Sequence, residues 1–116
     1  MFDNALFYSQ APEKLQGSHA LLEARIKEYA QLADAEADLL QAYREKRSAL
    51  LRESLKSGTP VTIAGDIARG ECAKEKAAWA KALAKKQQCR YAIDAVTNRI
   101  YTIRHLSSQI EHQTKA

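Results

Sequence analysis

The stretch CRYAIDAVTNRIYTI, residues 89–103, decides the fold of this chain of 116 residues. Its apolar residues recur at the alternating four-residue and three-residue spacing of a buried helical stripe, which predicts a seam like that of a coiled coil. The full stripe comprises Trp79, Ala82, Cys89, Ile93, Val96, Ile100, Ile103 and Ile110. Residues 71–112 contain neither glycine nor proline. The sequence therefore predicts one long helix over about residues 71–112.

A second long helix is predicted upstream, over about residues 15–57, where good helix formers dominate. Its stripe comprises Leu22, Ile26, Tyr29, Ala33, Leu40, Tyr43 and Leu50, with Glu36 and Arg47 as polar interruptions. The helix is expected to end at Ser57, because Gly58 suits the left-handed position after a helix and Pro60 cannot continue one. Its start has two candidates, a first turn at Pro12 or a restart with Ser18 as N-cap.

The connection, residues 58–70, is expected to hold a short helix rather than a flexible loop. Thr62 is a candidate N-cap and Gly70 a candidate C-cap, and Ile63 and Ile67 lie four residues apart on one face. Two long helices of similar length with a short connection favour an antiparallel hairpin. The fold class is therefore predicted to be all-α, as one helical-hairpin domain over residues 1–116.

The helix over residues 15–57 carries more apolar residues than a two-helix seam can bury. We therefore expect a homo-oligomer, a dimer or higher, with a four-helix bundle as its simplest form. The seam residues assigned to this oligomer are Leu32, Leu39, Cys89, Ile93, Val96, Ile100 and Ile103. The alternative is a monomer in which Met1–Tyr8 folds back over part of the apolar face. The order of residues 1–14 is left open.

Composition excludes several classes of protein. Apolar residues make up 46% of the chain, which suffices for one small domain and not for a multidomain enzyme. The apolar runs are too short to span a membrane, and the first residues do not have the pattern of a signal peptide. Two cysteines are too few for a secreted disulfide framework. These features predict a cytosolic protein with no membrane partner.

Basic charge gathers in the second half of the chain. From Val61 onward there are ten Lys and Arg against five Asp and Glu, a net charge of +5, whereas the net charge through Pro60 is −1. In a heptad built on the stripe of residues 79–110, basic residues flank the seam on both edges. Tyr91 and Tyr101 fall outside this seam. The residues predicted to contact a protein partner or nucleic acid are Lys81, Lys85, Lys86, Arg90, Tyr91, Arg99, Tyr101 and Arg104. The alternative is that these charges are solvated or form ion pairs between subunits.

No catalytic, cofactor or metal site is predicted. Cys72 and Cys89 lie 17 residues apart without a CxxC motif or a histidine at ligand spacing. His105 and His112 lack a third ligand, and the glycines at 65 and 70 are not followed by the Lys and Ser or Thr of a phosphate loop. Trp79 has seam spacing and is expected to pack in the core. We therefore expect a protein that is not an enzyme and needs no cofactor.

The segments Lys56–Thr62, Ile67–Gly70 and Ile93–Leu106 resemble small helical proteins encoded by tailed bacteriophages. The resemblance covers about the last two thirds of the chain and assigns no functional residue. It implies a phage or prophage accessory protein that works in the bacterial cytoplasm by binding. Three functions follow as hypotheses: binding of single-stranded DNA in recombination or replication, inhibition of a host nuclease or defence protein, and a structural coiled-coil scaffold.

Overall fold

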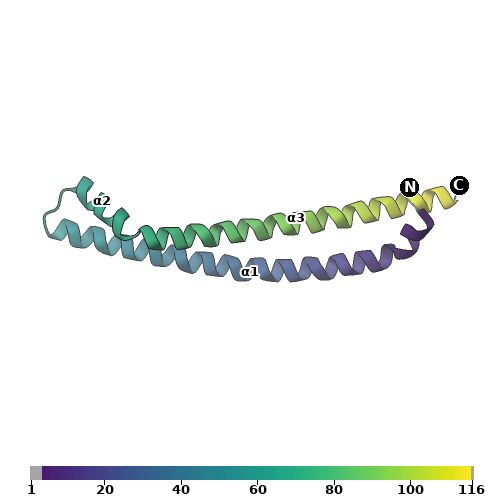
Figure 1. Cartoon of the computed structure of the whole chain (residues 1–116), viewed down its shortest axis with the longest axis horizontal. Helices are drawn as coiled ribbons and strands as arrows, with labels where there is room; N and C mark the ends of the chain where they lie inside the picture. The colour runs from purple at the N-terminus through teal and green to yellow at the C-terminus, as the bar shows by residue number, and fades with distance from the viewer. Residues whose placement is uncertain (1–3, 116) are drawn as a thin grey trace. The chain divides into compact units, whose positions relative to one another are not determined.

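The structure, a computed structural model, describes the backbone of residues 4–115 and the side chains of residues 10–113. This part of the chain forms three helices and no strand: α1 at Asn4–Lys56, α2 at Val61–Glu71 and α3 at Ala73–Lys115 (Figure 1). The predicted all-α order of a long helix, a short helix and a second long helix is confirmed. No helix within residues 4–115 is apolar over enough residues to cross a membrane.

The end of α1 follows the sequence prediction. Gly58 has a φ of 83°, the left-handed conformation that glycine adopts without strain. The N–H of Gly58 donates to the carbonyl of Leu55 at 3.1 Å, and the N–H of Thr59 donates to that of Ser54 at 3.0 Å. These two bonds form a Schellman motif, which satisfies carbonyls that the helix leaves without partners.

Both predicted caps of the short helix are wrong. Pro60, not Thr62, occupies the N-cap position of α2, without a side-chain hydrogen bond. Its φ of −56° and ψ of 145° place extended backbone directly before the helix, which leaves Thr62 inside the first turn. Gly70 also lies inside α2, because the helix continues to Glu71 and Cys72 is its C-cap. Cys72 is fully buried and is the single residue between α2 and α3.

The predicted start of α1 is also wrong. The helix begins at Asn4, so Pro12 and Ser18 lie inside it rather than at its first turn or N-cap. The physical reason is burial: Ala11, at 5% exposure, belongs to the core together with Ile103 and Ile110. A proline inside a helix removes one hydrogen bond and crowds the carbonyl four residues earlier, and packing of this segment in the core offsets these costs. The side chains of Met1–Tyr8, proposed as an alternative cover for the apolar face, lie outside the described residues.

The chain divides into two compact units, and α1 and α3 each contribute to both. The first unit comprises the described residues of Met1–Tyr29 and Gln88–Ala116. Its two helical segments run antiparallel, because Arg25 contacts Cys89 while His19 contacts Arg104. Its core is apolar, and Leu15 and Leu106 pack against the buried cluster of Ala11, Ile103 and Ile110.

The second unit is Ala30–Gln87, which contains the turn and α2. Its long helical segments also run antiparallel: Lys46 bonds Glu75, and Glu36 bonds Trp79. The buried face of α2 consists of small residues, Ala64 and Ala68 at 0% exposure. Ile63 and Ile67 share a face, but that face is exposed.

Candidate functional site

Two tyrosines on α3 are largely exposed in the first unit. Tyr91 is 71% exposed and Tyr101 is 64% exposed, as the sequence predicts for positions outside the seam. Arg90 and Arg99 are exposed nearby along the same helix. Ten residues of helix place the two tyrosines about 15 Å apart along the axis. These four residues are called the tyrosine–arginine surface below.

The remaining predicted contact residues have different surroundings. Lys81 and Lys85 are exposed on the part of α3 in the second unit, and no ion pair joins either of them to the described residues. Lys86 instead lies half-buried, with its Nζ 3.5 Å from Oε2 of Glu36. Arg104 is exposed in the first unit, where its Nη2 lies 3.4 Å from Nε2 of His19.

A polar cluster within the seam of the second unit explains the position of Lys86. Glu36 accepts a 2.8 Å hydrogen bond from Nε1 of Trp79, and the Trp79 ring stacks on Tyr43 with centroids 6.2 Å apart. The hydrogen bond from Trp79 lowers the pKa of Glu36, although its burial opposes the shift; the charge of Lys86 lowers it further. Trp79 therefore packs in the seam, as its spacing predicts, and its ring nitrogen is satisfied by Glu36.

This cluster predicts a loss of stability in acid. A carboxyl whose pKa is lower in the folded chain stabilises the fold above its unfolded pKa, and this contribution disappears as the pH falls through the folded pKa. The contribution of Glu36 is therefore complete at neutral pH and is lost progressively below 4.5, the ordinary value of the group. Glu75 adds to the effect, because the hydrogen bond from Lys46 lowers its pKa too.

The measurement is the thermal unfolding midpoint between neutral pH and about pH 3. Glu36→Gln is expected to flatten part of this dependence, whereas Glu23→Gln, an exposed glutamate outside the cluster, should leave it unchanged. An identical pH dependence in Glu36→Gln and the unmodified chain would contradict the role given to Glu36.

The residues assigned to an oligomer seam are mostly covered by the chain itself. Four of them are buried at 5–6% exposure: Cys89, Val96, Ile100 and Ile103. Ile93 and Leu32 are half-buried, and Leu39 is 36% exposed. The apolar stripe of α1 is less regular than predicted, because the side chain of Ile26 is 52% exposed.

Cys89 is a packing residue in this arrangement. Its Sγ donates a 3.3 Å hydrogen bond to the backbone carbonyl of Arg25, and burial raises the pKa of its thiol. A protonated, buried thiol is a poor nucleophile and a poor metal ligand. Within the described residues, no group of three or more His, Cys, Asp or Glu could hold a metal ion.

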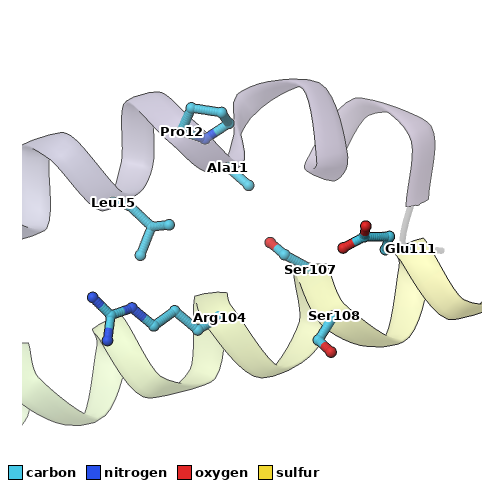
Figure 2. A pocket seen from close by; sticks show the side chains of 7 residues that line it. All are labelled: Ala11, Pro12, Leu15, Arg104, Ser107, Ser108 and Glu111. Carbon is cyan, nitrogen blue, oxygen red and sulfur yellow. The ribbon is translucent and has the colours of Figure 1, made fainter.

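The described residues of the first unit line at least two open pockets, and no motif in the sequence indicates either of them. The larger, of about 370 Å³, is lined by Ala11, Pro12, Leu15, Arg104, Ser107, Ser108 and Glu111 (Figure 2). Figure 2 shows the Ser107 hydroxyl directed toward α1, and its oxygen is buried without a hydrogen bond to the described residues. The smaller, of about 280 Å³, is lined by Lys14, Gly17, Ser18, Arg99 and Ile103.

Sequence reasoning missed these pockets because they depend on which α1 residue faces which α3 residue. Lys14 and Gly17 carry no motif, and only the register of the two helices brings them beside Arg99. Comparison with protein families, with curated proteins and with solved structures finds no match to this chain.

Proposed function

We propose that this protein acts by binding single-stranded DNA through the tyrosine–arginine surface of α3, without catalysing a reaction. The observation that carries the proposal is the exposure of Tyr91 and Tyr101, at 71% and 64%. A tyrosine ring normally buries its apolar body, so two exposed rings on one helix are available to another molecule. Stacking of bases on such rings is one of two sequence-independent contacts in single-strand binding, and the attraction of basic residues to the phosphates is the other.

The charges of the same surface support a nucleic-acid partner. Arg90 and Arg99 are exposed, and within the described part of the chain neither pairs with a carboxylate. A guanidinium presents a planar set of donors that suits phosphate oxygens. In the second unit, Lys81 and Lys85 supply further exposed positive charge on α3. The net charge of +5 from Val61 onward agrees with an anionic partner.

The resemblance to phage proteins supplies the biological setting of the proposal. We place the protein in the cytoplasm of a bacterial host, as an accessory of phage recombination or replication. Its partner there is DNA exposed as a single strand. No metal or cofactor is part of the proposed activity.

The test is a fluorescence-anisotropy titration of a labelled single-stranded oligonucleotide at low and at physiological salt. Binding is expected to weaken steeply with salt, because each phosphate contact contributes about 0.7 to the logarithmic slope. The triple variant Lys85→Glu, Arg90→Glu, Arg99→Glu should lower the affinity about 100-fold or more and reduce the slope by about 2, with helicity unchanged.

A matched control changes the same number of exposed charges elsewhere. Lys27, Arg52 and Lys56 are exposed on α1, and their replacement by Glu changes the net charge by the same amount. This control should retain most of the affinity. Equal losses in both triple variants would show that only net charge matters and would reject the tyrosine–arginine surface.

A second candidate function is protein binding, which exposed aliphatic residues in the second unit favour. Leu55, Val61, Ile63 and Ile67 are 47%, 74%, 52% and 43% exposed. Such a group suits self-association, as in the homo-oligomer or scaffold, or docking on a host or phage protein. The oligomeric mass of the protein, measured on the titration sample, distinguishes self-association from docking on another protein. An oligomer that does not bind DNA would favour a scaffold, and a monomer that does not bind DNA would favour a host-protein inhibitor.

A further inference from the structure

We propose that the exposed apolar face of α2 binds the same face of a second copy of this chain, with the two helices antiparallel about a two-fold axis. The proposal rests on the second candidate function, because it gives the exposed aliphatic residues of the second unit one partner. It does not depend on DNA binding by the tyrosine–arginine surface, which lies on α3 in the first unit.

The first argument is that α2 has its small apolar residues inside and its large ones outside. Ala64 and Ala68 are 0% exposed, whereas Ile63 and Ile67 are 52% and 43% exposed. A helix with water on its outer side normally directs its large apolar side chains toward the core and its polar side chains outward. The reverse arrangement in α2 indicates an outer face that packs against another molecule.

The second argument is the shape of this face. Ile63, Ile67 and Gly70 follow at intervals of four and three residues, so they form one stripe along the helix. Gly70 is exposed, and apart from its neighbours in the helix nothing lies within 4 Å of the position where a Cβ would stand. When two such helices run antiparallel about an axis beside Ile67, Ile63 of each copy lies opposite Gly70 of the other. A protruding side chain thus meets the space that a missing side chain leaves.

The third argument is the charge at the edge of the face, which favours a second copy over other partners. Asp66 and Arg69 form an exposed pair, with Oδ1 of Asp66 2.8 Å from Nη2 of Arg69. An edge with one acid and one base is complementary to its own antiparallel copy. In the pairing above, Asp66 of one copy lies about 3 Å along the axis from Arg69 of the other, within reach of the long arginine side chain. An exposed ion pair contributes little stability, so exchange of its partner between copies costs little.

The contact is expected to be weak and closed. An eleven-residue helix offers less than the roughly 800 Å² per partner of a stable interface, so we expect a dissociation constant of about 10–100 μM. A two-fold contact uses the same face on both copies, so association ends at the dimer. The seam of α3 is not available for this contact, because Val96, Ile100 and Ile103 are buried within the chain.

The experiment is sedimentation equilibrium of the full chain at concentrations from well below to well above this dissociation constant. The mass should rise from that of one chain to that of two chains. Asp66→Arg leaves only bases at the edge and Arg69→Asp only acids, so each variant alone should dimerise at least 10-fold more weakly. An equimolar mixture of the two should form a heterodimer about as tightly as the unmodified chain. Asp38→Arg makes the same charge change at an exposed residue of α1 in the same unit and should have no effect.

A second variant tests the apolar contact without adding charge. Ile63→Ser combined with Ile67→Ser should weaken dimerisation at least 10-fold. Circular dichroism should show unchanged helicity, because both side chains are exposed in the single chain. The affinity of this variant for single-stranded DNA should equal that of the unmodified chain, since α3 is not altered.

Two outcomes would overturn the proposal, and they bear differently on the second candidate function. If the unmodified chain keeps the mass of one chain at every concentration, the dimer is rejected, and protein binding would then require a different protein as partner. If the chain dimerises but the serine variant does so equally tightly, or the mixed charge variants do not associate, the chain self-associates through another face and the pairing of α2 is rejected.

Discussion

Replacement of Ile100 by aspartate is expected to destabilise the chain by about 4 kcal/mol or more. Ile100 is 5% exposed in the seam of α3. An aspartate there must either bury a charge without a partner or take up a proton, and both are costly in an apolar environment. Domains of this size have a total stability of about 5–15 kcal/mol, so the substitution should remove a large part of the free energy of unfolding.

The neighbouring residue provides the control. Tyr101 is 64% exposed, and Tyr101→Asp introduces the same charge one position along the same helix. It should cost less than about 1 kcal/mol, since exposed substitutions away from special features have small effects. Urea unfolding followed by circular dichroism measures both variants. Equal stability of the two variants would show that Ile100 is not a seam residue.

Trp79→Ala is expected to produce the second large effect, a loss of about 3 kcal/mol. The substitution removes the ring that stacks on Tyr43 at a 9° interplanar angle. It also deletes the donor that satisfies Glu36, so the carboxylate is left in the half-buried seam with Lys86 as its remaining partner.

Trp79→Phe separates the two contributions. The phenyl ring can still pack against Tyr43, but it has no N–H to donate to Glu36. This variant should fall between the unmodified chain and Trp79→Ala in urea unfolding. In addition, its stability should vary less with pH below 4.5, because the main cause of the lowered Glu36 pKa is gone. If Trp79→Ala unfolds at the same urea concentration as the unmodified chain, the cluster contributes no stability.

Much of the fold was predictable because the helical signals are local. The seam of α3 follows from the spacing of Val96, Ile100 and Ile103, all of which are buried. The end of α1 follows from Gly58, whose positive φ few other residues tolerate. Each signal depends on residues close together in the sequence, so it can be recognised without knowing the partner helix.

The cap and stripe errors have a common cause. Local preference alone predicts helix ends at Pro12, Thr62 and Gly70, but each of these residues lies inside a helix in the structure. Burial of neighbouring residues outweighs these local preferences. Ala11 is buried directly before Pro12, and Cys72 is buried two positions after Gly70. The spacing predicts Ile26 in the stripe, but its side chain is 52% exposed. Local propensity is weaker than the packing of the whole helix pair.

The candidate site was predictable only in part. The exposure of Tyr91 and Tyr101 follows from heptad positions, which a single helix defines. The pairing of Lys86 with Glu36 does not, although Glu36 interrupts the stripe of its helix in the sequence. Recognising them as partners requires the register between the two helices. That register also brings Lys14 and Arg99 to the lining of one pocket, although they lie 85 positions apart in the chain.

The contacts between α1 and α3 close loops of very different length. The separations are 29 residues for Lys46 and Glu75, 43 for Glu36 and Trp79, 64 for Arg25 and Cys89, and 85 for His19 and Arg104. Closing the longest loop directly costs about 1 kcal/mol more chain entropy than closing the shortest. Folding is therefore expected to begin near α2 and to proceed like a zipper toward the chain ends, because each added turn then closes only a short further loop. By the same reasoning the contact between His19 and Arg104 is lost first when the helices separate, so the ends of the helix pair should open more readily than the part near α2.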